Sequence, residues 1–432
     1  MNPEAEELNE KIKQNNPNLF SMLSEKGKNI FFPKKGILGQ TAEAKGKEID
    51  ATVGVALEED GSPMRLKSIA SNIININPKD IFLYAPSFGL NNLREKWKEL
   101  IYEKNPSLNG KEISLPVVTN ALTHGLSIAG YMFVEKDDKI ISPDLFWGNY
   151  KLVFINAYGA TIETFPTFVN ENFNVEGLRD KLLDDKGKKI VLLNFPNNPC
   201  GYTPTNDEVD KIVNTIKEAA ETGNNIVVLI DDAYFGLVYK DGVSKESIFS
   251  RLSDLNEKVV AIKLDGATKE DYVWGLRVGF VTYGMKNVTK EVYEALEAKT
   301  AGAIRGNISN ASNLSQSLIL NAFNSPGYNK EKNEKYNLLK RRFEAVRQAL
   351  SAHKEFEEVF EALPYNSGYF MCVKLKDGLD AEKVRQRLLQ DYNTGVIVTG
   401  NIIRLAFSAV PVDKMPKLFE NLYSACKDEN KD

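Results

Sequence analysis

Seven short apolar runs, most of them separated by stretches with helical spacing, follow one another from residue 117 onward. Only the connection over residues 235–256 is less regular. Strands that alternate with helices run parallel and are covered on both faces. The sequence therefore predicts an α/β fold, with a mostly parallel seven-stranded sheet between helices. The expected strands fall within residues 116–119, 139–142, 160–165, 189–195, 225–231, 259–264 and 278–283.

The chain has 432 residues, which is long for a single hydrophobic core, so we expect two domains. A large domain is predicted over 66–324. A smaller α+β domain is predicted from 1–65 and 325–432, with the N-terminal segment as an arm. Its later part shows a strand at 368–375, a helix from Asp380, strands within 397–407 and a last helix from Val412. Residues 286–323 and 327–352 are predicted to be long helices.

The first ninety residues have a less regular pattern. Polar helices are predicted over 3–27, a strand within 51–63 and helices over 64–74 and from Asn91. Residues 30–40 are apolar with Pro and Gly, which indicates an ordered arm rather than a linker. The composition of this arm is compatible with a lid over a ligand, and the sequence leaves open whether it closes.

Composition excludes several classes of protein. The net charge is −4 and no basic cluster stands out, so neither nucleic acid nor a membrane surface is an expected partner. No apolar run approaches the roughly 18 residues of a membrane span. Three unpaired-looking cysteines argue against a disulfide framework, and two histidines cannot build a metal site alone. No metal is expected, and the expected location is the cytoplasm.

Lys269 lies in a short polar segment between two of the apolar runs, and Arg277 follows eight residues later. A lysine in this position lies where a strand ends and a loop opens, which is a usual place for an amine that meets a small molecule. A solvated surface lysine would fit the same pattern. The functional interpretation depends on other stretches that point to the same site.

Two of those stretches also follow apolar runs. Residues 194–204 form a rigid turn of Asn, Pro and Gly that offers amide side chains, including that of Asn198, to a ligand. Asp231 closes an apolar strand, where an unpaired carboxylate is costly, and Tyr234 can face the same crevice. A plain tight turn and a helix-capping or solvated acid are the structural alternatives.

Arg404 is a third signal, because its guanidinium lies within the apolar strand over 402–407. Such a group favours a carboxylate partner, either a structural one or a ligand. An amine, a strand-end carboxylate, a phenol, an amide and two guanidinium groups together suit pyridoxal phosphate. Lysine forms its Schiff base, and an acid keeps its ring nitrogen protonated.

In their order along the chain, these motifs resemble the fold-type I pyridoxal phosphate enzymes, specifically the class I/II aminotransferases related to aspartate and aromatic aminotransferases. The order is Tyr84 before a Gly-containing turn, NNP-x-G, D-x-A-Y, a lysine with an arginine eight residues on, and a late strand arginine. The resemblance extends from about Ile30 to the last helix. It implies a transaminase that uses pyridoxal phosphate.

The resemblance implies a role for each matching residue. Lys269 would hold the cofactor and move the substrate proton, Asp231 would pair with the ring nitrogen, and Tyr234 and Asn198 would bond the phenolic oxygen. Arg277 and the backbone of a helix N-terminus would bind the phosphate. Arg404 would bind the substrate α-carboxylate, with Asn198 and Gly54 beside the substrate. The remaining implied cofactor contacts are Ala121, Leu122 and Thr123 of the phosphate cup, Trp147 stacked on the ring, and Tyr84 from the other subunit of a homodimer.

Several positions depart from the family pattern. Ala121 and Leu122 stand where small Ser or Gly residues are common, and Gly266 stands where many members have a serine that binds the phosphate. Cys200 replaces the usual threonine of the NNP-x-G turn. Ser317 stands where dicarboxylate-specific relatives have an arginine, although Arg305 could substitute or could be structural.

The expected function is a ping-pong transamination between an L-amino acid and a 2-oxo acid, within amino-acid metabolism and biosynthesis. The donor is left open between aspartate, aromatic and other apolar amino acids. A lyase that acts on an amino acid with the same cofactor is the alternative. A regulatory domain that only binds the cofactor and an inactive scaffold are further alternatives, and the complete set of chemical groups argues against the scaffold.

Overall fold

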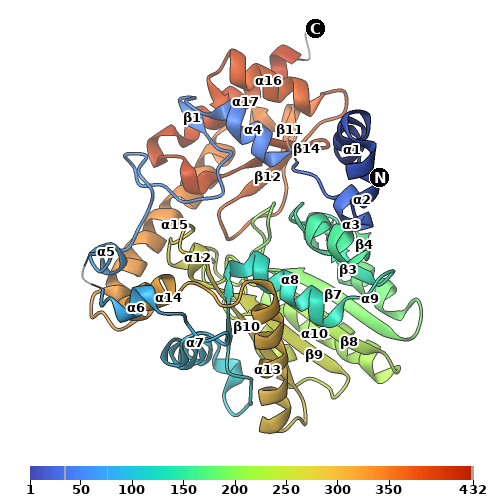
Figure 1. Ribbon diagram of the computed structural model, residues 1–432. Coiled ribbons are helices and arrows are strands. Elements are labelled where there is room, and N and C mark those ends of the chain that lie inside the picture. The colour runs from blue at the N-terminus through green and yellow to red at the C-terminus, as the bar shows by residue number, and fades with distance from the viewer. Residues whose placement is uncertain (34–35, 75, 430–432) are drawn as a thin grey trace.

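A computed structural model describes residues 1–33, 36–74 and 76–429. Its main feature is a seven-stranded sheet in the order β2-β10-β9-β8-β7-β3-β4 (Figure 1). The strands from β9 to β4 are parallel, whereas β10 runs antiparallel to both β9 and β2. The predicted mostly parallel sheet is confirmed. Its strands are β2 Val117–Asn120, β3 Lys139–Pro143, β4 Thr161–Phe165, β7 Lys188–Asn194, β8 Asn225–Asp231, β9 Val259–Asp265 and β10 Val278–Met285.

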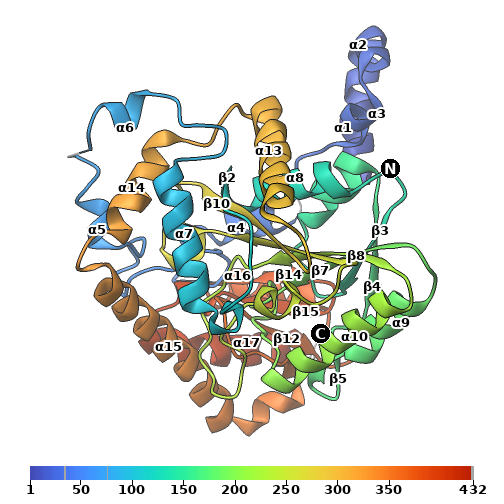
Figure 2. The same cartoon turned by 90° about the horizontal axis from the view of Figure 1, so that it is seen from below.

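Helices cover both faces of this sheet, with α8 and α13 on one side and α9 and α10 on the other (Figure 2). Strand β7 shows why its sequence is continuously apolar. Ile190 and Leu192 pack in one buried cluster with Leu126 of α8, while Val191 and Leu193 pack in another with Ile212 of α10. The helices around the sheet are α7 Asn91–Lys104, α8 Ala121–Phe133, α9 Val175–Leu183, α10 Asn206–Glu221, α13 Lys290–Asn307 and α14 Asn313–Phe323.

A second, four-stranded antiparallel sheet lies in the C-terminal part, in the order β11-β12-β15-β14. Helices α15, α16 and α17 lie beside it (Figure 1). The predicted domain boundaries remain a prediction. The elements of this part are β11 Phe360–Ala362, β12 Met371–Leu375, β13 Thr394–Gly395, β14 Ile397–Thr399, β15 Ile402–Leu405, α15 Tyr328–Ala352, α16 Ala381–Gln390 and α17 Met415–Glu429, with the short 3-10 helices η3 Lys354–Glu358, η4 Phe407–Ala409 and η5 Val412–Lys414.

The N-terminal segment forms α1 Pro3–Asn15, α2 Pro17–Met22 and α3 Glu25–Asn29, which project beyond the rest of the molecule (Figure 2). The predicted arm over 30–40 includes Lys34 and Lys35, which lie outside the described residues. Its last part is helical, because α4 spans Ile37–Ala44. Gln40 fastens α4 to β14: its Nε2 donates to the Val398 carbonyl at 3.1 Å, and its Oε1 accepts from the Val398 amide at 2.7 Å.

Three predictions of local structure were wrong. The segment 51–63 forms no regular strand: β1 Ile49–Asp50, just before it, pairs in parallel with β13, and within it Leu57 and Pro63 form an isolated antiparallel bridge. The helix expected over 64–74 is reduced to α5 Lys67–Ala70. The long helix expected over 286–323 breaks between α13 and α14, where Ser309 has a φ of 69° and the Ser312 side chain caps α14. The cap formed by Ser312 therefore outweighs the helix propensity of the surrounding residues.

The remaining described elements are short. No helix among the described residues is long and apolar enough to span a membrane. The short elements are α6 Lys79–Phe82, α11 Phe249–Leu252, α12 Ala267–Glu270, β5 Phe168–Val169, β6 Asn172–Phe173, the 3-10 helix η1 Pro106–Leu108 and the π-helix η2 Lys151–Asn156.

Candidate active site

A cavity of about 270 Å³ lies at the carboxyl ends of β7, β8 and β9. Ligands in open parallel sheets bind at this edge, because the loops there diverge. The cavity brings together every predicted site residue except Tyr84. Its lining includes Gly54, Ala121, Leu122, Thr123, Trp147, Asn198, Asp231, Tyr234, Lys269, Arg277 and Arg404.

Asp231 is held at the end of β8 by its neighbour on β7. The Asn194 side chain donates to the Asp231 carbonyl at 2.8 Å, and its oxygen accepts from the Asn198 amide at 2.8 Å. One asparagine thus ties the strand end to the turn that carries Asn198. The sequence analysis did not single out Asn194, although it opens the Asn-rich string.

The turn over residues 194–204 is closed by Gly201, whose φ is 68°. A Cβ at this position would lie 1.9 Å from the Phe370 carbonyl oxygen, so only glycine fits. Cys200 is buried, and its amide donates to Asn197 Oδ1 at 3.1 Å. The turn therefore keeps a closed geometry with cysteine in place of threonine.

Tyr150 is a site residue that the sequence analysis missed. Its hydroxyl donates to Asp231 Oδ2 at 2.5 Å, and both side chains are buried. Burial raises the pKa of Asp231 above its ordinary range, and the Tyr150 hydrogen bond acts in the opposite direction. Tyr150 lies three residues after Trp147 in the same aromatic stretch, which was the only available signal.

Replacing Tyr150 with phenylalanine is expected to lower kcat by roughly tenfold, because a hydrogen bond to a buried carboxylate is lost. The pKa of Asp231 should rise further, so the acidic limb of the pH–rate profile should move to higher pH. Steady-state kinetics across pH measure both effects. Tyr158→Phe is the matched control, because that hydroxyl donates to the Ser127 carbonyl instead. An unshifted acidic limb in Tyr150→Phe would contradict the role assigned to this hydrogen bond.

Lys269 lies in α12, one turn after the end of β9. Its amine is buried, and lies 5.4 Å from the centre of the Tyr234 ring. Burial, followed by the nearby Arg277, lowers the pKa of Lys269 to about 8, while Asp231 opposes the shift. A much larger fraction of this amine is therefore neutral near physiological pH than in an ordinary lysine, and a nucleophile or base must be neutral.

The N-terminus of α8 points its first residues, Ala121 to Thr123, into the cavity. In the part of the chain that the structure describes, no side chain caps this end, so its first amides keep their hydrogen-bonding capacity. Ala121 has a φ of 63°, which costs energy for a non-glycine residue. Uncapped amides at a helix N-terminus form an anion site whichever side chains they carry.

Two glycines pack the sheet against this anion site. A Cβ at Gly279 would lie 2.7 Å from the Ala121 carbonyl carbon, and one at Gly266 would lie 2.5 Å from the Val278 carbonyl oxygen. The departure at Gly266 is therefore a requirement of close packing in this chain. The serine hydroxyl of other family members has no equivalent at that position.

Arg277 lines the same end of the cavity and is half-buried. Its φ is 54°, and its Nη1 donates to the Trp274 carbonyl at 3.2 Å. A strained backbone held beside a cavity is often part of a ligand site. A guanidinium together with the α8 amides provides the donors that a phosphate group needs.

Arg404, on β15, also lines the cavity. Its Nη2 donates to the Thr52 carbonyl at 2.9 Å, and its guanidinium lies 4.3 Å from the Phe370 ring. Its Nε is buried without a partner, and no carboxylate pairs with it among the described residues. A buried cation without a counter-ion is costly, so this arginine is poised for an anionic ligand.

The other predicted residues have different positions. Trp147 and Gly54 line the cavity, whereas Tyr84 is 90% exposed and lies away from it. Ser317 is buried in α14 and does not line the cavity, and Arg305 is exposed. Thr268, Phe370 and Ile37 also line the cavity, although the sequence analysis did not select them.

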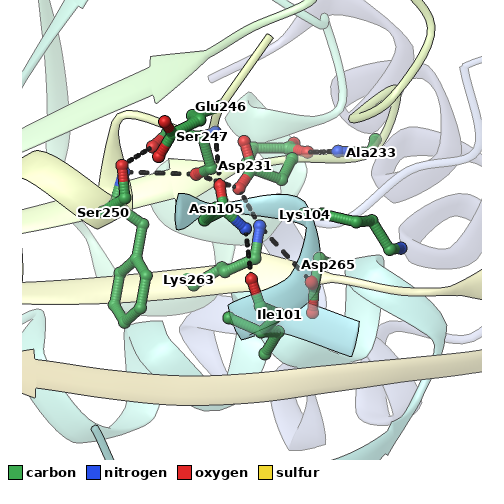
Figure 3. A network of polar contacts seen from close by, with 12 residues as sticks. Ile101, Lys104, Asn105, Asp231, Ala233, Glu246, Ser247, Ser250, Lys263 and Asp265 are labelled. Carbon is green, nitrogen blue, oxygen red and sulfur yellow. Dashed lines mark hydrogen bonds and ion pairs between the residues drawn. The ribbon is translucent and has the colours of Figure 1, made fainter. Parts of the chain in front are cut away.

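A buried polar network lies behind the cavity (Figure 3). Asp232, next to Asp231, faces away from the site and pairs with Lys263, which also lies 3.3 Å from Asp265. Lys263 is fully buried and connects the ends of β8 and β9. The two acids at the end of β8 thus have different roles: Asp231 faces the cavity, and Asp232 forms a structural ion pair.

These observations fit pyridoxal phosphate. The anion site at α8 suits its phosphate, Asp231 suits its ring nitrogen, the Lys269 amine suits its aldehyde, and Trp147 can stack on its ring. The unpartnered Nε of Arg404 leaves a place for the carboxylate of a substrate. The fold and the site together define a fold-type I pyridoxal phosphate-dependent enzyme.

A family model described as aminotransferase class I and II matches residues 49–422. The chain belongs to this family, whose members are transaminases that use pyridoxal phosphate. This confirms the predicted family, enzyme class and cofactor.

Known relatives share 24–25% sequence identity with this chain. The chain is 24% identical to a cytoplasmic aspartate aminotransferase of Caenorhabditis elegans, over 75% of this chain and 78% of the relative. It is 25% identical to aromatic-amino-acid aminotransferase 2 of Thermococcus litoralis, over 55% and 58% of the two chains. The latter match therefore spans little more than half of the relative. An aminotransferase structure from Anaerococcus prevotii superposes with a TM-score of 0.83 and 24% identity, and covers 94% of this chain and 99% of that one.

Proposed function

We propose that this protein transfers the amino group of an L-amino acid to a 2-oxo acid by a ping-pong exchange. The observation that carries the proposal is Arg404. Its buried guanidinium has no acidic partner among the described residues and shares a cavity with Lys269 and Asp231. A planar carboxylate is the ligand that best compensates such a group, and every amino acid and 2-oxo acid carries one.

The other lining residues would orient the cofactor, which supplies an electron sink when bound. The α8 amides and Arg277 bind its phosphate, and Asp231 keeps its ring nitrogen protonated. Tyr234 and Asn198 donate hydrogen bonds to its phenolic oxygen. Asn198 also lies beside Arg404, since Arg404 Nη1 is 3.4 Å from Asn198 Oδ1.

Lys269 is the proposed acid–base group. Its amine would be the group that removes the proton from the substrate Cα. A pKa lowered to about 8 keeps enough of this amine neutral to act as a base. The same amine would hold that proton and give it back, and hydrolysis by water would release the 2-oxo acid and complete one half of the exchange.

We also propose a homodimer in which Tyr84 reaches the partner's site. Exposed apolar side chains gather in the segment over 73–84: Ile73, Ile74, Phe82, Leu83 and Tyr84 are 55–90% exposed. Soluble monomers rarely expose such a patch, and a second copy of this chain would cover it. Sedimentation of the purified enzyme tests this proposal, and a monomer at working concentration would contradict it.

Arg305 lies close to the same segment. Its Nη1 donates to Ser309 Oγ at 2.8 Å, and the Ser309 carbonyl accepts from the Ser87 hydroxyl at 2.8 Å. Ser87 is three residues from Tyr84, so a dimer that brings Tyr84 to the partner's site would bring Arg305 near it. This geometry supports Arg305, rather than buried Ser317, as the candidate for a distal carboxylate.

A cytoplasmic enzyme of amino-acid biosynthesis is the proposed setting. The three cysteines are free and buried, which suits a reducing compartment. Cell fractionation tests the location. Growth of a deletion strain with and without single amino acids tests the role in biosynthesis.

The direct test of the transaminase proposal is an absorbance spectrum of the purified enzyme. Single L-amino acids added without an acceptor should shift the visible cofactor band to shorter wavelength in one stoichiometric turnover. A 2-oxo acid added afterwards should restore the band. Oxo-acid product that accumulates without any acceptor would indicate a lyase instead. A protein that shows no band with added pyridoxal phosphate would contradict the proposal entirely.

A further inference from the structure

A second cavity, of about 430 Å³, adjoins the first and shares Ile37, Trp147, Asn198 and Arg404 with it. A ligand whose carboxylate binds Arg404 can therefore extend from the first cavity directly into the second. Volumes of roughly 300–1,000 Å³ are usual for pockets that hold whole small molecules. This second cavity is much larger than the side chain of a small amino acid requires.

Three parts of the chain form its walls. The N-terminal arm and α4 contribute Phe31, Ile37 and Leu38, and the aromatic stretch with η2 contributes Phe146 and Leu152. The small sheet contributes Ile397, Val398 and Ile402. The walls are rigid where Gln40 pairs with both backbone groups of Val398. Most of the surface offered to a ligand is therefore aliphatic or aromatic.

The polar side chains in this cavity are mostly engaged elsewhere. Asp144 accepts from the amide and hydroxyl of Thr167, at 2.9 and 2.7 Å. Among the described lining residues the cations are Arg404 and Lys151. Lys151 is exposed, and its amine lies 5.7 Å from the ring of Phe146, one of the wall residues. An acidic side chain would lose solvation here, and the buried cation among the described lining residues, Arg404, would already bind the α-carboxylate.

We infer that this second cavity, which we call the side-chain pocket, selects amino donors with an aromatic or long apolar side chain. The inference rests on the proposed transaminase function and names its donor class. Arg404 would hold the α-carboxylate at the junction of the two cavities, and the side chain would lie between Phe146 and the β14–β15 edge. Burial of such a side chain supplies the preference, because apolar area leaves water.

The first measurement compares donors on the wild-type holoenzyme. The rate of the cofactor absorbance shift is followed with L-phenylalanine, L-tryptophan, L-leucine, L-alanine, L-aspartate and L-glutamate. We expect kcat/KM for L-phenylalanine to exceed that for L-alanine by about 100-fold, since each buried methylene contributes roughly 10-fold or more. A preference for L-aspartate or L-glutamate would overturn the inference. No shift with any donor would instead contradict the proposed function.

Variants test whether the side-chain pocket causes the preference for apolar amino donors. Val398→Trp fills the side-chain pocket and should lower the ratio of phenylalanine to alanine kcat/KM at least about tenfold. The control is Val169→Trp, at an exposed position on β5 outside both cavities, which should leave the ratio unchanged. An unchanged ratio in Val398→Trp would contradict the assignment of the pocket. The wild-type donor panel stays decisive if that variant does not fold.

Two charge variants test which cation would bind an acidic side chain if the enzyme preferred L-aspartate. If L-aspartate were preferred, loss of that preference in Arg305→Gln would show that Arg305 binds the side-chain carboxylate. Loss of the preference in Lys151→Gln would show that Lys151 binds it. The control is Lys290→Gln, at an exposed position outside both cavities, which should leave kcat/KM for L-phenylalanine within about twofold of the wild type.

Discussion

Replacing Lys269 with alanine is expected to abolish the visible cofactor band and to lower turnover by at least about 10⁴-fold. Two functions are lost together: the amine that bonds covalently to the cofactor and the base that moves the α-proton, each of which contributes orders of magnitude. Absorbance spectroscopy and a coupled transamination assay measure the two effects. The buried position of this amine and its pKa of about 8 support both roles.

The control for this variant is Lys290→Ala, because the side chain of Lys290 is 86% exposed. It should keep the wild-type spectrum and rate. Added methylamine can occupy the space of the missing side chain and should restore part of the lost rate in Lys269→Ala. Full activity of Lys269→Ala without added amine would refute the proposed mechanism.

Replacing Arg404 with leucine should lower kcat/KM for every amino donor by about 10²–10³-fold, which corresponds to the roughly 2–5 kcal/mol of a buried charge pair. The cofactor band should persist, because Arg404 contacts Thr52, Asn198 and Phe370 rather than the residues proposed to bind the phosphate. Donor titrations of the absorbance shift measure the loss. Since the arginine has no acidic partner within the described residues, its removal leaves no carboxylate unpaired and the fold should survive.

Arg404→Lys should recover little of the lost activity, because an ammonium cannot form the paired hydrogen bonds of a guanidinium. Arg341→Leu is the surface control and should behave as the wild type. If Arg404→Leu kept wild-type kcat/KM for all donors, the α-carboxylate would have to bind elsewhere. The side-chain pocket would then lose its anchor as well.

The seven strands of the large sheet and their mostly parallel pairing were predictable because these strands are buried on both faces. Continuous apolar runs such as Ile190 to Leu193 are required by that burial and are visible without coordinates. The polar residues that end these runs, Asp231 among them, were also visible in the sequence, because each one interrupts a continuous apolar run. Carboxyl ends of parallel strands meet at one edge, so residues distant in sequence share a cavity.

The segments outside the sheet were predicted less well. Residues 51–57 have a strand-like pattern, yet the chain runs irregularly past Gly54 to line the cavity. The break at residues 308–312 follows from a serine cap and a left-handed Ser309, which compete with helix formation over short distances. The hydrophobic pattern of a segment does not show whether a capped break or a continued helix is more stable.

The sequence by itself determined the order of the strands' apolar runs and the chemical groups of the site: an amine, carboxylates, a phenol and guanidinium groups. Only the tertiary structure decided how those groups are used. It turned Asp231 towards the cavity and Asp232 towards Lys263, and it brought Tyr150 to Asp231. It also left Arg404 without a counter-ion and joined the side-chain pocket to the first cavity. The physical reason is that burial, charge pairing and cavity shape depend on contacts between residues far apart in the chain, which periodicity and composition do not encode.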